Sequence, residues 1–314
     1  MANGQWFPPD WPDRIRALAD GTLEPVVPKR AATVMLLKDG DGSAGPSVHM
    51  LRRRASMAFA GGAYAYPGGG VDPRDDERHV GWAGPTRAWW AERLGVDATA
   101  AQAIVCAAVR ETYEEAGVLL AGPTPDSVVG DTTGADWEAD RAALVARELS
   151  FAEFLERRGL ILRSDLLGAW TRWITPEFEA RRYDTWFFVA ALPEGQLTRN
   201  VSTEADRTVW IRPEDAAASY DKGELLMMPP TIATLRQLTP YATAAEALAA
   251  APGRDLTPVL ARARLVDGEV VLSWTGHEEF TKHIPTRTAT DSAPHTPTAS
   301  TPHTPTSPTG GAPA

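Results

Sequence analysis

The feature that most constrains the fold is the segment 98–116, which has a helix start signal, a helix stop signal and two chemically different faces. Asp97 is a natural N-cap, and Gly117 is a natural C-terminal stop. At about 100° per residue, one face of such a helix is mostly apolar. Its members are Gln102, Cys106, Val109, Tyr113 and Ala116. The spacing therefore predicts a helix over 98–116 that packs this face against a core.

The opposite side of the same helix carries three glutamates, Glu111, Glu114 and Glu115, within an arc of roughly 100°. Like charges at this spacing repel, and the C-terminal end of a helix disfavours anions. A hard divalent cation such as Mg²⁺ or Mn²⁺ would compensate, because these ions prefer oxygen ligands. A solvated acidic face is the simpler alternative. Arg110 borders the acidic side and is placed to pair with Glu114.

The rest of the sequence alternates strand patterns with helix patterns. Strands are predicted at 31–37, 48–53, 183–192 and 209–211. Helices are predicted at 85–95, in two or so pieces over 135–159, at 164–170, from Pro213 onward and at 230–238. This mixture predicts an α/β fold, an α/β/α sandwich in which helices pack on both faces of a mixed sheet.

Shifts in composition predict the domain organisation. Residues 1–28 are rich in proline and tryptophan and are expected to form an irregular arm with one short helix. A single domain is expected over 29–280, with insertions at 76–96 and 135–170. The segment 281–314 consists mainly of Thr, Pro, Ser and Ala. It cannot bury enough surface to offset its ordering entropy and is predicted to be disordered.

Charge and hydropathy exclude several classes of protein. The net charge of −10 argues against nucleic-acid binding, which usually needs a basic face. No stretch approaches the roughly 18–20 continuous apolar residues of a membrane span, and the N-terminus lacks the pattern of a secretory signal. The single cysteine, Cys106, fits a reducing compartment and a buried position on the apolar helix face. We therefore expect a cytoplasmic protein, monomeric or homodimeric, whose partner is a small molecule.

A glycine-rich loop precedes the acidic helix, and the two segments together resemble a known signature. The loop ends in Pro67-Gly68-Gly69-Gly70, and the helix carries Arg110-Glu111-Thr112-Tyr113-Glu114-Glu115-Ala116-Gly117-Val118. This combination resembles the signature of the Nudix hydrolases, G-x5-E-x7-R-E-U-x-E-E-x-G-U, in which U is an aliphatic residue.

The chain departs from this signature in three places. Thr112 stands at an aliphatic position, and Asp75, counted from Gly69, stands where the signature has glutamate. The third departure is the spacing, since 34 residues rather than seven separate Asp75 from Arg110. An enlarged signature of this kind resembles the coenzyme A diphosphatase-like branch of the family, often called nudix motif 19 proteins.

Other segments resemble the same branch. They are 59–69, 106–120, 173–176 and 181–188, and the resemblance covers roughly residues 30–240. The coenzyme A signature of the family expects an arginine near position 58, where this chain has Ala58.

The resemblance implies metal-dependent hydrolysis of a pyrophosphate linkage. It implies that Glu111, Glu114 and Glu115 hold the metal ions together with the backbone carbonyl of Gly68, where the missing Cβ allows close approach. Catalytic roles are expected for Arg110, Glu111, Glu115 and Glu204. The base that activates water is either Glu111 or Glu204; the alternative for Glu204 is an exposed loop acid.

Candidates for substrate contacts lie outside the helix. Gly69 is one, and the basic run Arg52, Arg53 and Arg54 supplies the others. Side chains alternate along a strand, so one or two of these arginines would reach a phosphate; a solvated edge strand is the alternative. Four tryptophans are candidates either for an adenine or acyl pocket or for core packing: Trp82, Trp89, Trp90 and Trp173.

Three functions remain open from the sequence. The favoured one is cleavage of coenzyme A or acyl-coenzyme A to 3′,5′-ADP and (acyl-)phosphopantetheine. The second keeps this chemistry for another diphosphate, namely ADP-ribose, NADH or a nucleotide sugar. The third is a non-catalytic Nudix module that senses a nucleotide. Sensors of that kind commonly lose carboxylates of the signature, whereas all three glutamates are present here.

Overall fold

The computed structural model describes residues 8–40, 45–56, 60–76, 80–275 and 277–280. The segment predicted to be disordered, 281–314, and Ala58 lie outside the described residues.

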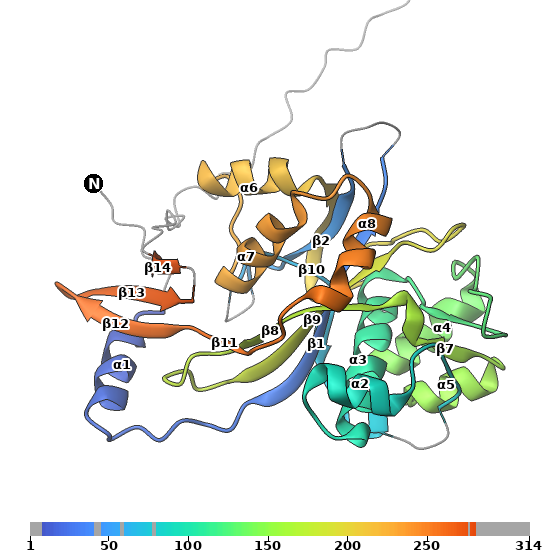
Figure 1. Ribbon diagram of the computed structural model, residues 1–314, viewed down its shortest axis with the longest axis horizontal. Helices are drawn as coiled ribbons and strands as arrows, with labels where there is room; N and C mark the ends of the chain where they lie inside the picture. The colour runs from blue at the N-terminus through green and yellow to red at the C-terminus, as the bar shows by residue number, and fades with distance from the viewer. Residues whose placement is uncertain (1–7, 41–44, 57–59, 77–79, 276, 281–314) are drawn as a thin grey trace, which may run out of the picture. The chain divides into compact units, whose positions relative to one another are not determined.

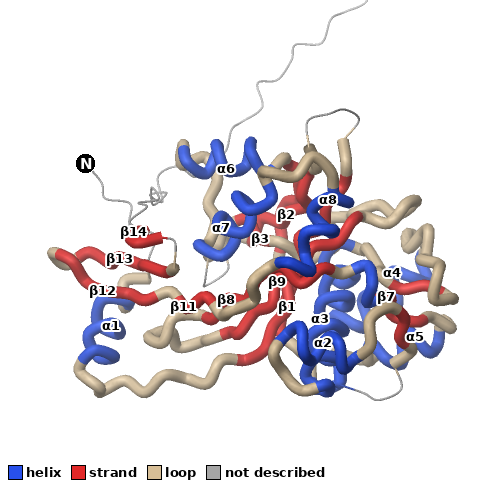
Figure 2. Tube along the Cα trace, in the orientation of Figure 1, coloured by secondary structure: helices blue, strands red, loops and turns tan. Residues whose placement is uncertain are grey.

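Helices and strands follow one another in mixed order along the chain (Figures 1 and 2). The described helices are α1 (Trp11–Ala19), α2 (Arg87–Leu94), α3 (Ala98–Ala116), α4 (Ala135–Val145), α5 (Phe151–Arg157), α6 (Pro213–Asp221), α7 (Pro229–Leu238) and α8 (Ala244–Ala250), with the short 3-10 segments η1 (Pro73–Asp76), η2 (Ser164–Leu166) and η3 (Ala251–Gly253). The described strands are β1 (Lys29–Lys38), β2 (Ser47–Arg53), β3 (Tyr64–Ala65), β4 (Gly68–Gly70), β5 (Trp82–Ala83), β6 (Ala121–Gly122), β7 (Ile161–Arg163), β8 (Gly168–Ile174), β9 (Tyr183–Ala191), β10 (Ala205–Ile211), β11 (Val259–Leu260), β12 (Arg262–Val266), β13 (Glu269–Trp274) and β14 (His277–Phe280).

The large sheet is mixed. Its strand order is β10-β2-β1-β9-β8-β11, with β3 paired to β2 and β4 paired to β1. The central strands β1 and β9 run parallel, whereas β2 and β4 run antiparallel to β1, and β8 runs antiparallel to β9. Strands buried on both faces read as continuous apolar runs, as residues 34–37 do in the middle of β1, where all four are 0% exposed.

Helices cover both faces of this sheet (Figure 1). On one face, Ala32, Val34 and Leu36 of β1 belong to the hydrophobic core that contains α3. On the other face, Gly168 of β8 lies against the end of α8, so that an added Cβ would lie 2.5 Å from the Cβ of Ala251. The mixed α/β architecture predicted from the sequence is confirmed.

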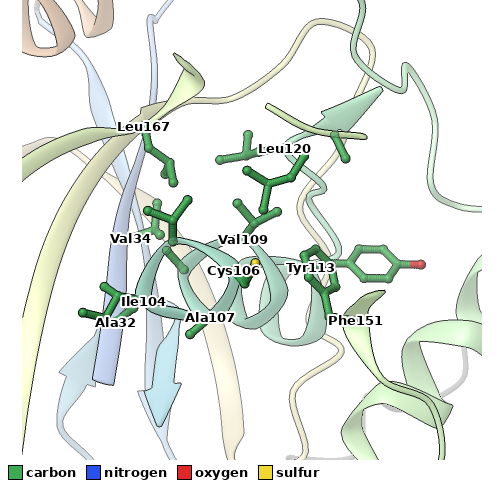
Figure 3. Close-up of a cluster of buried hydrophobic side chains, with 14 of the residues drawn as sticks. Ala32, Val34, Ile104, Cys106, Ala107, Val109, Tyr113, Leu120, Phe151 and Leu167 are labelled. Atoms are coloured by element: carbon green, nitrogen blue, oxygen red, sulfur yellow. The ribbon is translucent and has the colours of Figure 1, made fainter. Parts of the chain in front are cut away.

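Helix α3 is fixed in place by burial along most of its circumference (Figure 3). Ile104, Cys106 and Val109 are all 0% exposed, as the predicted apolar face requires. Tyr113 stacks on Phe154 with ring centroids 5.2 Å apart, and its hydroxyl donates a hydrogen bond to the Trp137 carbonyl. Each fully buried large apolar side chain contributes roughly 1.5–3 kcal/mol. This packing therefore holds the acidic C-terminal end of α3 in a fixed position.

The bounds of α3 are those predicted from its caps. The Asp97 carboxylate accepts a hydrogen bond from the Ala100 amide at 2.8 Å, and Gly117 adopts a φ of 71°, which favours glycine. The predicted helix at 164–170 is wrong beyond its first three residues. Residues 168–174 instead form β8, because pairing with β9 buries their aromatic side chains and overrides the local helical pattern.

Two smaller sheets complete the described structure. One is β5-β7-β6, in which β5 lies in the predicted insertion 76–96, β7 lies in the predicted insertion 135–170, and β6 lies between the two insertions in sequence. The other, β12-β13-β14, was not predicted, and α1 packs against it. Within the described residues, no helix is both long and apolar enough to cross a membrane.

Candidate active site

The glycine-rich strand β4 meets the C-terminal turn of α3 at the edge of β1. Gly68 pairs with Thr33 of β1, and its amide donates a hydrogen bond to Glu115 Oε2 at 2.9 Å. An added Cβ on Gly69 would lie 2.5 Å from Glu111 Oε1, and one on Gly68 would lie 2.6 Å from the Ala32 carbonyl oxygen. Glycine is therefore required at both positions, because the Cβ of any other residue would push β4 away from the carboxylates of Glu111 and Glu115.

Arg110 joins the loop, the helix and η1 through one buried guanidinium group. Its Nε and Nη2 donate to the Asp75 carboxylate at 3.0 and 2.9 Å, and Nη2 also donates to the Gly70 carbonyl. Its Nη1 donates to Glu111 at 2.8 Å and to Glu114 at 3.1 Å. The predicted pairing of Arg110 with Glu114 is confirmed. The bond to Asp75 was not predicted, because 34 residues separate the partners in the sequence.

Two carboxyl groups at this junction are held in an environment that disfavours their charge. Burial raises the pKa of Glu115 to about 8, and repulsion from Glu111 adds to the shift. Burial raises the pKa of Glu111 to about 7, although attraction to Arg110 partly opposes the change. A carboxylate in such a position needs either a proton or a nearby cation at neutral pH.

The donor chemistry fits a hard divalent cation. Glu111, Glu115 and the adjoining loop carbonyls offer oxygen atoms only, the ligand type that Mg²⁺ and Mn²⁺ prefer. In the part of the chain that the structure describes, no three acidic, histidine or cysteine side chains converge closely enough to enclose a metal ion. Glu114 and Glu111 both accept a hydrogen bond from Nη1 of Arg110.

A cleft of about 1530 Å³ opens over this junction. Its lining includes all the glutamates and glycines predicted for the site: Gly68, Gly69, Glu111, Glu114, Glu115 and Glu204. Glu204 lies directly before β10, which pairs with β2, and Arg53 Nη1 lies 3.9 Å from Glu204 Oε2. The structure thus brings Arg53 and Glu204 to the same cleft as the acidic end of α3.

The other two arginines of the basic run do not line the cleft. Arg52 donates to Asp206 at 2.6 Å, and Arg54 donates to the Thr203 carbonyl at 2.6 Å, both at exposed positions. Alternation along β2 separates Arg53 from its neighbours, as the strand pattern requires.

None of the four candidate tryptophans lines the cleft. Trp90 is 1% exposed, and Trp173 packs edge-on against Trp274 with ring centroids 5.5 Å apart. Trp89 is 42% exposed and contacts Trp90. The structure assigns these side chains to packing outside the cleft. Aromatic residues of the cleft that the sequence did not single out are Tyr66, Phe151, Tyr183 and Phe187.

The chain is similar to characterised families both in sequence and in fold. Residues 91–238 match the family of NUDT19 Nudix domains. The acyl-coenzyme A diphosphatase NUDT19 of Gallus gallus is 25% identical over 265 residues, which cover 68% of this chain and 69% of that protein. The human protein of the same name is 30% identical over 149 residues, which cover 44% of this chain and 39% of that protein.

A crystal structure of a Nudix hydrolase from Alicyclobacillus acidocaldarius is similar to the structure described above. Its TM-score is 0.59 at 28% sequence identity, and the match covers 71% of this chain and 96% of that one.

Proposed function

Because this chain is a Nudix pyrophosphohydrolase of the NUDT19 branch, we propose that it cleaves the pyrophosphate bond of coenzyme A or acyl-coenzyme A with the help of Mg²⁺ or Mn²⁺. One observation carries the proposal: Glu111 and Glu115 lie buried against β4 at the cleft, where their carboxyl groups need either a proton or a cation. The curated relatives named acyl-coenzyme A diphosphatase support the choice of substrate.

Glu111 and Glu115 would hold the metal ions with the Gly68 carbonyl, and Glu114 is the further candidate ligand. Bound divalent ions neutralise the charge that develops on phosphoryl oxygens. The protein's own side chains position the proposed metal ligands. Arg110 holds Glu111 and Glu114 in place through the bonds that also anchor Asp75.

Arg53 and Glu204, which are neighbours at the cleft, supply a phosphate-binding group and a general base. Arg53 is half-buried and faces the cleft, where its guanidinium can bind a phosphoryl oxygen of the substrate. The Glu204 side chain is 60% exposed, and its charge is close enough to Glu115 to raise the pKa of that carboxyl group. Because Glu204 is not one of the proposed metal ligands, it can accept the proton of the attacking water without losing a ligand. We therefore favour Glu204 over Glu111 as the general base. Gly69 allows the Glu111 carboxylate to lie directly against β4 at the cleft, where we place the diphosphate.

The test is a substrate panel incubated with Mg²⁺ or Mn²⁺, with products separated by anion exchange. The panel contains coenzyme A, acetyl-coenzyme A, ADP-ribose, NADH and a nucleotide sugar. We expect 3′,5′-ADP and (acyl-)phosphopantetheine from the first two. Cleavage of ADP-ribose alone would contradict the coenzyme A assignment and leave the diphosphate chemistry intact.

A further inference from the structure

Three rows of side chains form the floor of the cleft on the face of the sheet that lies opposite α3. The parallel pairing of β1 with β9 sets Thr33 beside Phe187, Ala31 beside Thr185, and Lys29 beside Tyr183. All six residues line the cleft. Figure 2 shows β1 and β9 running side by side. The floor thus leads from the catalytic junction, where Gly68 pairs with Thr33, to a rim at the start of both strands.

The spacing of these rows leaves room for a nucleoside. Thr33 lies four positions after Lys29, which corresponds to about 13 Å along a strand. The middle row carries only a methyl group from Ala31 and the small side chain of Thr185. A substrate whose diphosphate lies at Gly68 and Gly69 can therefore extend its ribose and base over this row toward Lys29 and Tyr183.

The rim combines exposed cations with an exposed aromatic ring. Lys29 and Arg181 are both exposed, and neither has a carboxylate within 4.0 Å among the residues that the structure describes. Tyr183 is 42% exposed, pairs with Lys29 in the register of β1 and β9, and follows Arg181 by two positions in the sequence. In a chain of net charge −10, two cations without acidic partners at the mouth of a cleft are suited to an anionic ligand.

The backbone that carries these side chains is held rigidly by Arg182. This residue is only 8% exposed, and its guanidinium donates to the Thr175 carbonyl at 3.0 Å and to the Val26 carbonyl at 2.7 Å. Its own carbonyl accepts a hydrogen bond from the Lys29 amide at 2.9 Å. The two segments of the rim are therefore tied together before any ligand binds, which lowers the entropy lost on binding.

We propose that this rim, formed by Lys29, Arg181 and Tyr183, selects substrates whose nucleoside carries a further phosphate on its ribose. Lys29 and Arg181 bind that phosphate, and the ring of Tyr183 packs against the base. The proposal rests on the proposed function for the position of the diphosphate. It adds a source of specificity, because the rim distinguishes a nucleotide with the extra phosphate from one without it.

The direct test is calorimetric binding of the nucleotide half alone. The full-length protein is titrated with 3′,5′-ADP and with 5′-AMP, which differ only in the ribose phosphate. We expect 3′,5′-ADP to bind more tightly, on the order of tenfold, from charge-assisted contacts. The double variant Lys29→Gln and Arg181→Gln should bind the two nucleotides equally. The matched control is Lys222→Gln, an exposed cation outside the cleft, which should keep the preference.

A second arm uses turnover and separates this inference from the proposed function. Coenzyme A is compared with 3′-dephospho-coenzyme A, and the double variant should lose on the order of tenfold in kcat/KM on coenzyme A only. Equal binding of 3′,5′-ADP and 5′-AMP by the wild-type protein would overturn the rim proposal, as would an unchanged preference in the double variant. A binding preference without any coenzyme A hydrolysis would uphold the rim and overturn the proposed substrate.

Discussion

The charged side chains at the two ends of the cleft differ in burial and in pairing. At the junction of α3 and β4, Arg110 is 8% exposed and shares four bonds with the carboxylates of Asp75, Glu111 and Glu114. At the rim, Lys29 and Arg181 are exposed and, within the described residues, have no ion-pair partner. A buried paired charge positions other groups, whereas an exposed unpaired charge is available to a ligand. Substitutions at the junction should therefore affect turnover and folding stability, whereas substitutions at the rim should affect ligand binding.

The largest expected effect is on turnover, from a substitution at the junction. Glu115→Gln keeps the size and shape of the side chain but removes the charge that we propose binds the metal ion. We expect kcat/KM to fall about 1000-fold, which corresponds to about 4 kcal/mol. The control Glu224→Gln changes an exposed acid outside the cleft. Near-normal turnover by the Glu115 variant, with an unchanged circular dichroism spectrum, would refute the junction as the catalytic centre.

The next effect is on folding stability. Asp75→Asn removes the charge that faces the buried Arg110 guanidinium, and we expect the free energy of unfolding to fall by about 3 kcal/mol. Urea denaturation measures this change. The neighbouring Asp76 is exposed, so Asp76→Asn is the matched control and should leave stability nearly unchanged. Equal stability of the two variants would show that the Asp75–Arg110 pair does not hold the site together.

A third prediction concerns a buried ionisable group without a partner. His49 of β2 is 0% exposed, and neither ring nitrogen has a hydrogen-bond partner among the described residues. Burial lowers its pKa from 6.5 to about 4, and the charge of Lys38 adds to the shift. Because the folded-state pKa is the lower one, protonation favours the unfolded chain. The stability from this group is complete above pH 6.5 and is lost as the pH falls toward 4.

The corresponding measurement is urea denaturation at pH 7 and at pH 4.5, for the wild-type protein and for His49→Leu. The wild-type protein should lose up to about 3 kcal/mol more than the variant between these pH values. Other groups titrate in the same range, so only the difference between the two proteins reports on His49. An identical pH dependence in both proteins would contradict the neutral buried state.

The smallest expected effect completes the comparison between the two ends. The double substitution of Lys29 and Arg181 with glutamine should change the free energy of unfolding by no more than about 0.5 kcal/mol, because both side chains are exposed and unpaired. Thermal unfolding of this variant beside Asp75→Asn measures the contrast. A large loss of stability at the rim would mean that these cations support the fold rather than a ligand.

Sequence reasoning succeeded where the determining contacts are local. The caps Asp97 and Gly117 set the ends of α3, and the bond between Arg110 and Glu114 spans a single helical turn. The apolar face around Cys106 follows from helical periodicity alone. The mixed sheet was predicted in outline from alternating strand and helix patterns, without its strand order.

Sequence reasoning failed where the contacts are distant. The rim depends on the parallel pairing of Lys29 with Tyr183, and the position of Glu204 at the cleft depends on the pairing of β10 with β2. No periodicity in either segment reveals its partner strand. The wrong helix at 164–170 has the same origin, because β9 decides the conformation of β8. In the basic run, alternation predicted that some arginines would face away, but only the structure identifies Arg53 as the one that lines the cleft.

The central claim is that buried carboxylates on α3 bind a divalent cation, and isothermal titration of the full-length protein with Mn²⁺ tests it most directly. We predict saturable binding by the wild-type protein, weakened at least about tenfold by Glu115→Gln and unchanged by Glu224→Gln. Absence of binding to the wild-type protein, or equal affinity in the Glu115 variant, would contradict the account.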